Sequence, residues 1–194
     1  MLVAQRGDTI IEVLLAFTVF SLISVGAMTV MNQATNASQR ALEITLVRQQ
    51  IDAQAEALRA AQQAFSRTAD PANSQWFKFA KSGAANNTIH FASQTACPTN
   101  GVINSSGAFT MDPSTATYVM GSTWYKDITA ASARPYAQMV GTESYGIWIE
   151  RSYRPGNVNL PNSYDFTIRA CWFGAGMAER PMQIETTVRL YEPR

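Results

Sequence analysis

RGDTIIE at residues 6–12 is followed directly by VLLAFTVFSLISVGAMTVM at residues 13–31, and this run sets the architecture of the chain. No residue from Val13 to Met31 carries a charge. At 1.5 Å per residue, a helix of this run is about 28 Å long, close to the roughly 30 Å hydrocarbon thickness of a bilayer. Glu12 lies at the edge of the run, where a carboxylate is costly unless it has a partner. The sequence therefore predicts a membrane-spanning helix that carries one functional acid.

The segment RGDTIIEVLLAFTVFSL at residues 6–22 resembles the amino-terminal signature of type IV pilins and pseudopilins. In that family a short basic leader ends in glycine, a membrane-embedded prepilin peptidase cuts after the glycine, and an acid follows five residues on. The resemblance implies that residues 1–7 are a leader cut after Gly7. Asp8 becomes the new amino terminus, the position that the family usually N-methylates. The family most often begins its mature chain with phenylalanine, so aspartate at this position bears on methylation more than on cleavage.

Glu12 matches the acid of the family, and the resemblance implies a role in assembly. In the family, each acid pairs with the terminal amine of a neighbouring subunit. A carboxylate in a lipid-like environment is costly unless paired, so this pairing favours one register between subunits. The alternative is an acid that stabilises the amino end of its own helix through the helix dipole.

The predicted helix continues from residue 32 to residue 70 without proline or glycine and ends at Asp70, because the residue before Pro71 resists the helical conformation. Apolar residues recur at steps of three and four and predict a seam packed on a sheet, in preference to a coiled coil. The seam comprises Ile44, Val47, Ile51, Ala55, Leu58, Ala61 and Phe65. Charged residues mostly take the rest of the circumference: Arg40, Glu43, Arg48, Asp52, Glu56 and Arg59. Within residues 8–31, Gly26 is either a weak point of the helix or a small residue for close packing.

Residues 71–143 predict an irregular region. Trp76–Lys81 is expected to form a short helix capped by Asn73 or Ser74. Short strands are expected at Thr88–Ala92 and Tyr118–Met120. TNGVINSSGAF at residues 99–109 is rich in turn-forming residues and is expected to be exposed.

Residues 144–194 predict three strands, Tyr145–Tyr153, Tyr164–Phe173 and Met182–Tyr191, separated by turn-forming residues. Apolar and polar residues alternate in the last two strands, the pattern of a half-buried antiparallel sheet. With one face of this sheet on the amphipathic helix, the fold class is α+β. This is also the fold that the resemblance to pilins implies.

The two cysteines, Cys97 and Cys171, lie far apart and form no CxxC motif. An even count in an exported domain favours one disulfide, and two buried thiols in a reducing compartment are the alternative. Alternation places Cys171 with Asp165, Thr167 and Arg169 on the face turned away from the helix. A disulfide would therefore link the irregular region across the outer face of the sheet.

Evidence for catalysis or for a metal or cofactor site is weak. His90 is the only histidine, and no nucleophile, zinc or phosphate-loop motif occurs, so we expect neither an enzyme nor a cofactor. No loop has calcium-ligand spacing, although carboxylates are available at Asp112, Asp127, Glu143 and Glu150. A set of aromatic residues could form a recognition surface but is expected to be core: Trp76, Phe77, Trp124, Tyr125, Tyr136, Trp148 and Trp172. A net charge of +1 gives no electrostatic footprint for nucleic acid.

These features, with the resemblance, predict a pilin-like subunit of a type IV pilus for surface adhesion or motility, most consistent with a minor pilin. The expected partners are other pilin subunits, the prepilin peptidase, the membrane and an external surface. The amino terminus is expected in the cytoplasm and the remainder outside, because Arg6 is the only basic residue before the span. One alternative is a pseudopilin of a secretion or DNA-uptake system. Another is a membrane-anchored protein that does not polymerise.

Overall fold

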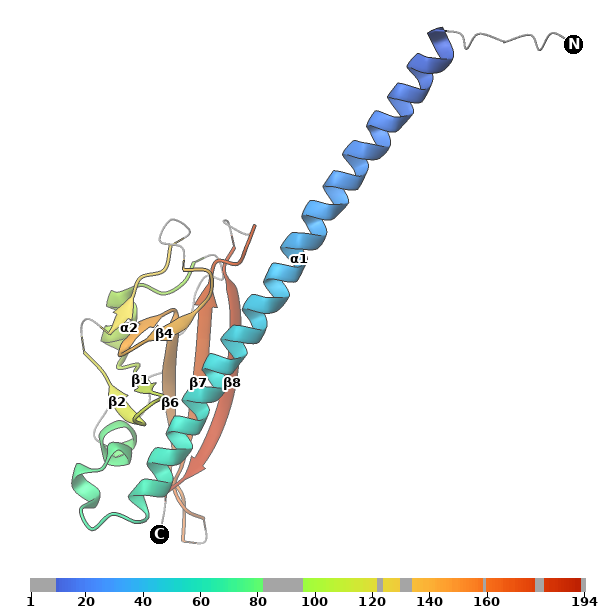
Figure 1. Ribbon diagram of the computed structural model, residues 1–194. Coiled ribbons are helices and arrows are strands. Elements are labelled where there is room, and N and C mark those ends of the chain that lie inside the picture. The colour runs from blue at the N-terminus through green and yellow to red at the C-terminus, as the bar shows by residue number, and fades with distance from the viewer. Residues whose placement is uncertain are drawn as a thin grey trace, which may run out of the picture. The chain divides into compact units, whose positions relative to one another are not determined.

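The computed structural model describes residues 10–81, 96–121, 124–129, 134–158, 160–176 and 180–192 (Figure 1). Gly7, Asp8, His90 and the predicted strand Thr88–Ala92 lie outside the described residues. The chain forms two compact units, residues 1–41 and residues 42–194. Helix α1, Ile10–Phe65, contributes to both, and each unit is described by itself.

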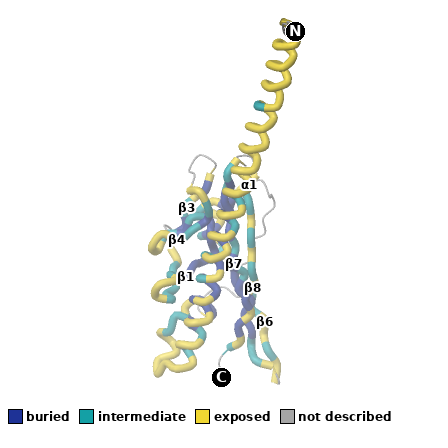
Figure 2. Tube along the Cα trace, turned by 45° about the vertical axis from the view of Figure 1, so that its right-hand side comes forward, coloured by how far each residue is buried: buried dark blue, intermediate teal, exposed yellow. Residues whose placement is uncertain are grey.

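In the first unit, α1 is exposed along its length, and none of residues 10–41 is buried (Figure 2). This part of α1 is long and apolar enough to cross a membrane. Its hydroxyl groups bond back to the helix: Ser21 Oγ donates to the carbonyl of Phe17 at 2.8 Å, and Ser24 Oγ donates to that of Phe20 at 2.9 Å. The surface of this segment is therefore apolar even where the sequence has serine.

In the second unit, the predicted seam of α1 is confirmed. Val47, Ile51, Ala55, Leu58 and Ala61 are buried, and Ile44 and Phe65 pack against them in part. The helix ends at Phe65, however, and not at Asp70. Hydrogen bonds tighten to a spacing of three residues at positions 67 and 68, and residues 66–73 are all exposed. Residues 66–73 bury no face against the sheet, so no packing stabilises a helix beyond Phe65.

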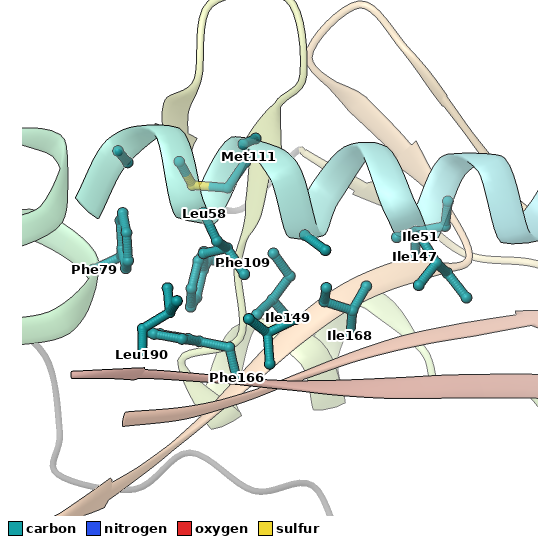
Figure 3. Close-up of a cluster of buried hydrophobic side chains, with 14 of the residues drawn as sticks. Ile51, Leu58, Phe79, Phe109, Met111, Ile147, Ile149, Phe166, Ile168 and Leu190 are labelled. Carbon is teal, nitrogen blue, oxygen red and sulfur yellow. The ribbon is translucent and has the colours of Figure 1, made fainter. Parts of the chain in front are cut away.

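The carboxyl-terminal sheet has three antiparallel strands in the order β6-β7-β8: Ile147–Arg154, Ser163–Trp172 and Met182–Tyr191. The prediction of three strands is confirmed, with ends that differ by one or two residues. One face of the sheet packs on α1: Figure 3 shows Ile51 and Leu58 of the helix above Phe166 and Ile168 of β7. This packing forms the first hydrophobic core.

The region between helix and sheet is more regular than expected. It contains η1 (Pro71–Asn73), η2 (Phe77–Lys81), α2 (Asn100–Ser106) and strands β1 to β5, at Thr110–Asp112, Thr117–Val119, Tyr125–Lys126, Gln138–Val140 and Glu143–Tyr145. The expected helix near Trp76 is present, and Ser74 Oγ caps it by accepting the N–H of Phe77 at 3.1 Å. A strand lies near the expected one at Tyr118.

The expectation of an exposed segment at residues 99–109 is met only in part, because residues 103, 108 and 109 are buried. The segment forms α2, which buries Ile103 completely and ends at Gly107 in the left-handed conformation (φ 73°). Gly107 caps the helix, because glycine adopts this conformation without strain. One buried isoleucine among polar residues gives no clear helical period in the sequence.

A second core covers part of the outer face of the sheet. Trp148 of β6 and Cys171 of β7 pack there, and the remaining members come from the region before the sheet: Cys97, Ile103, Ala108, Trp124, Tyr125 and Ile128. The sheet is thus buried on both faces at the end where β7 finishes. Its outer face near the beginning of β7 carries polar and charged side chains.

Candidate functional site

The apolar segment, defined here as residues 10–31, presents hydrophobic side chains to its surroundings. Ile10, Phe17, Phe20, Leu22 and Met31 are each at least 68% exposed. Surfaces of this size on a soluble protein mark contact with a membrane or with another protein. The apolar segment is therefore the main candidate functional surface of the chain.

Glu12 lies in the first turn of α1 and is exposed among apolar neighbours. Within the described residues it has no hydrogen bond or ion pair. Its predicted partner is the amine at Asp8 of a neighbouring subunit, and Asp8 lies outside the described residues. Near the start of the helix, a carboxylate gains some stability from the helix dipole, about 0.3–1 kcal/mol at an exposed position.

Gly26 does not interrupt the helix, which is continuous through it. A side chain added there would meet no atom within 4 Å. A free face of this kind leaves room for another helix to approach closely.

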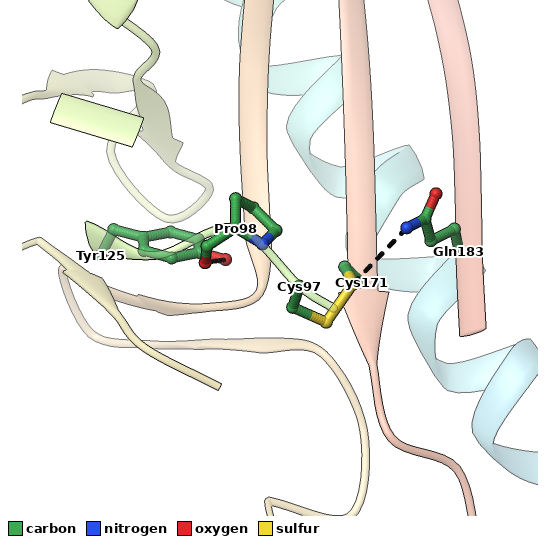
Figure 4. Close-up of a disulfide and its surroundings, with 5 residues drawn as sticks. All are labelled: Cys97, Pro98, Tyr125, Cys171 and Gln183. Atoms are coloured by element: carbon green, nitrogen blue, oxygen red, sulfur yellow. Dashed lines mark hydrogen bonds between the residues drawn. A yellow bond between two sulfur atoms is a disulfide. The ribbon is translucent and has the colours of Figure 1, made fainter. Parts of the chain in front are cut away.

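Cys97 and Cys171 form a disulfide, with Cα atoms 5.6 Å apart and a sequence separation of 74 (Figure 4). The bond joins the segment before α2 to the end of β7, on the outer side of the sheet as the alternation predicted. The Tyr125 hydroxyl donates to the carbonyl of Pro98 at 3.2 Å. Burial raises the pKa of Tyr125, so this phenol keeps its proton. Together these contacts hold the segment at Cys97 in the second core.

A glycine lets the chain approach this disulfide closely. Gly146 has a φ of 74°, and a Cβ atom there would lie 2.1 Å from the carbonyl oxygen of Cys171. The N–H of Cys171 donates to the carbonyl of Gly146 at 2.8 Å. Only glycine fits this position, because any side chain would collide with the backbone of β7.

The prediction that Glu43 lies on the polar side of α1 is wrong. It is buried, with 8% of its surface exposed. Its carboxylate accepts the indole N–H of Trp172 at 3.2 Å and the backbone N–H of Ala175 at 3.1 Å. The spacing could have revealed it, since Glu43 precedes Val47 by four residues and so lies on the seam.

Gln54 is a second polar residue that the sequence analysis missed. It is fully buried, and its amide bonds to Met111 in both directions, donating to the carbonyl at 2.7 Å and accepting the N–H at 2.8 Å. The side-chain amide therefore satisfies both backbone groups of Met111 in β1, as a neighbouring strand would. Its position three residues after Ile51 also lies on the seam.

The outer face of the sheet carries two sets of ion pairs. Asp165 lies between Arg154 and Arg189, at 2.8 and 2.6 Å. Arg169 lies between Glu150 and Glu185, at 3.1 and 2.8 Å. The Arg189 guanidinium beside Asp165, with a smaller contribution from Arg154, lowers the pKa of that carboxyl group.

The carboxylates considered as calcium ligands are dispersed. Glu143 pairs with Lys126 at 2.9 Å, Glu150 pairs with Arg169, and Asp112 accepts hydrogen bonds from Ser114. Asp127 accepts the backbone N–H of Asn100. No group of three histidine, cysteine or acidic residues comes together within the described ranges.

The aromatic residues considered for a recognition surface are mostly core. Five are buried, and Phe77 and Tyr136 are half-buried. Trp76 is fully buried, and its ring contacts those of Phe79 and Tyr164 edge to face. The hypothesis of an aromatic binding surface is therefore wrong for the five buried members, which are Trp76, Trp124, Tyr125, Trp148 and Trp172.

Comparisons with protein-family models, with curated proteins and with solved structures found no match to this chain. The architecture itself is an α+β fold with a long apolar amino-terminal helix and a carboxyl-terminal antiparallel sheet.

Proposed function

We propose that this chain is a structural subunit of a type IV pilus-like filament, cut after Gly7 and assembled through its apolar segment. The observation that carries the proposal is a helix segment of apolar exposed residues with one carboxylate, Glu12, at its start. A lone membrane anchor gains from an acid at this position only the small stabilisation by its own helix dipole. A bundle of such helices gains more, if each carboxylate meets an amine of a neighbour.

The unit formed by residues 42–194 is consistent with this role. A single helix packs on one face of an antiparallel sheet, and a disulfide links the opposite face to the segment before α2. A disulfide of this kind suits a domain carried outside the cell. The expected partners are other subunits, a prepilin peptidase, the membrane and an external surface. The proposed work of the chain is assembly and adhesion or motility, with no reaction of its own.

Mass spectrometry of the native amino terminus tests the proposal directly. We expect the chain isolated from its own cells to begin at Asp8, and any methyl group on that residue to be visible in the same spectrum. Electron microscopy of the same material should show filaments. An intact residue 1–7 segment on a protein that forms no polymer would refute the proposal.

A further inference from the structure

Strand β8 forms an edge of the sheet β6-β7-β8. Within the described residues no strand pairs with its second edge. Its ten residues, MQIETTVRLY, include no proline or lysine, which commonly protect an exposed edge against pairing with another chain. Its two charged residues, Glu185 and Arg189, have opposite signs. The edge of β8 is therefore long, regular and open to a further strand.

The hydrogen bonds of the sheet show which backbone groups point to this edge. The N–H of Glu192 donates to the carbonyl of Asn162 at 2.9 Å and continues the β7–β8 register by one residue. Successive backbone groups of a strand point to opposite edges. The groups of the odd-numbered residues therefore point away from β7. At one end, the carbonyl of Tyr191 accepts the side-chain N–H of Gln62 at 2.6 Å, which leaves residues 183–189 for pairing.

The side chains of β8 on the outer face of the sheet are all exposed, and their charges are placed symmetrically. Glu185 lies two residues before Thr187, and Arg189 lies two residues after it. We propose that β8 pairs antiparallel with β8 of a second copy of this chain, with Thr187 opposite Thr187 on a two-fold axis. Each Glu185 then faces the second copy's Arg189, so two ion pairs flank a threonine pair.

The charges select this register among its neighbours. With the axis at Glu185 or at Arg189, like charges would lie directly opposite each other. With the axis one residue away from Thr187, neither charged residue would face an opposite charge. Only the axis at Thr187 avoids like charges opposite each other and also places each charged residue opposite one of the other sign. On the inner face the same register places Ile184 opposite Leu190, so apolar residues also continue across the junction.

The register also extends the ion pairs that the sheet already contains. Asp165 contacts Arg189 and Arg169 contacts Glu185 within one copy. Addition of a second β8 gives rows of alternating sign, in which Asp165 and Arg189 are followed by the second copy's Glu185 and Arg169. The Thr167–Thr187 hydroxyl contact, 3.1 Å, lies between these rows and gains a third threonine.

The pairing fixes the relative direction of the two copies. Glu43 lies beside Ala175, in the connection that leads to β8, and Gln62 lies beside Tyr191 at its end. This part of α1 therefore runs parallel to β8. A two-fold axis perpendicular to β8 reverses that direction in the second copy. If the chain polymerises with all copies aligned, which rests on the proposed function, the second copy belongs to a filament of opposite direction.

Cysteine cross-linking of the full chain in detergent tests the pairing. In Thr187→Cys the two introduced cysteines lie directly opposite each other, within the Cα separation that a disulfide tolerates. In the control Tyr191→Cys, on the same face of the same strand and away from the native disulfide, they lie about 26 Å apart. Under mild oxidation we expect a covalent dimer with Thr187→Cys and none with Tyr191→Cys. Equal yields from the two variants would overturn the proposal.

Charge reversal then tests the register. In the Thr187→Cys background, Glu185→Arg alone and Arg189→Glu alone should each reduce the dimer to the level of the Tyr191→Cys control. A mixture of the two variants should restore a heterodimer, because each 185–189 contact again joins opposite charges. Unchanged dimer in the single variants, or no recovery in the mixture, contradicts the proposed register.

These measurements use unassembled protein and need no filament. A chain that forms no pilus can still give the Thr187 cross-link, and a pilus subunit can fail to give it. The cysteine comparison also leaves both charges in place, so it decides the matter even if charge reversal weakens the fold.

Discussion

At the scale of the residue, two glutamates of α1 have contrasting surroundings. Glu12 is exposed on an apolar helix with no partner among the described residues, whereas Glu43 is buried and accepts hydrogen bonds from Trp172 and Ala175. A carboxylate that the fold satisfies has a structural role. A carboxylate left at an apolar surface is a candidate for contact with another molecule.

For Glu12 we expect Glu12→Ala to block incorporation into filaments while leaving cleavage after Gly7 intact. The change removes the charge that would select the register between subunits but leaves the cleavage site. Glu56→Ala, at an exposed acid elsewhere on α1, is the matched control and should be both cleaved and incorporated. Immunoblots of sheared filaments and of the membrane fraction measure both steps. Normal incorporation of Glu12→Ala would refute the assembly role.

For Glu43 we expect Glu43→Ala to lower the free energy of unfolding by about 2–3 kcal/mol, because it leaves two donors without an acceptor. Denaturant unfolding followed by the fluorescence of the four tryptophans measures this. Glu43→Gln, which keeps an acceptor oxygen, should cost less than Glu43→Ala. If Glu43→Ala costs no more than Glu56→Ala, the buried hydrogen bonds contribute little to stability.

The ion pairs of Asp165 predict a pH dependence. The pKa of this carboxyl group is lowered from 3.8 in the folded protein, chiefly by Arg189. The unfolded chain therefore binds a proton at Asp165 more readily than the folded chain does. The stabilisation is complete above the unfolded pKa and is lost as the pH falls through the folded value.

We accordingly expect Asp165→Asn to be less stable than the wild type at pH 7 and to lose less stability between pH 5 and pH 3. Unfolding midpoints across this range measure the difference. Asp52→Asn, at an exposed acid of α1, should follow the wild-type curve. Parallel curves for wild type and Asp165→Asn would show that the ion pairs do not govern acid stability.

At the scale of the element, patterns that repeat over many residues were predicted well. The alternation in Met182–Tyr191 and the steps of three and four from Ile44 to Phe65 correspond to a strand and to a buried helix face. The end of α1 and the helix α2 were not predicted correctly, because each depends on contacts with distant residues. Ile103 of α2 is buried by the second core, which the local sequence does not show.

The disulfide links the segment before α2 to the end of β7, and its removal should have a local effect. A closed loop of this length stabilises the folded state by about 4.5 kcal/mol in the chain-entropy model. Relative to the wild type, we expect the double variant Cys97→Ser with Cys171→Ser to show a larger acceleration of amide hydrogen exchange at α2 and β3 than at β8. Mass-spectrometric hydrogen exchange measures this. Equal acceleration in all three elements would show that the two cores unfold together.

At the scale of the whole molecule, the sequence separates surface from core. Both core clusters consist of residues from Ile44 onward, and no residue of the range 10–41 is buried. The candidate functional surface could therefore be located from the sequence, because an uncharged run of this length needs no tertiary context. The ion pairs on the outer face could not be located in this way, since they depend on the registers of β7 with β6 and with β8.

This separation predicts that a chain of residues 42–194 folds without the apolar segment. Every residue that is buried within the described ranges, both cores and the disulfide remain in it, and the exposed apolar residues of the range 10–31 are gone. We expect a water-soluble protein whose near-ultraviolet circular dichroism and disulfide match those of the full chain in detergent. Aggregation of this chain, or loss of its tryptophan signal, would mean that residues 10–41 contribute to the fold. A folded product would assign these residues to contacts with a membrane or with other subunits, because they would then contribute nothing to the stability of their own chain.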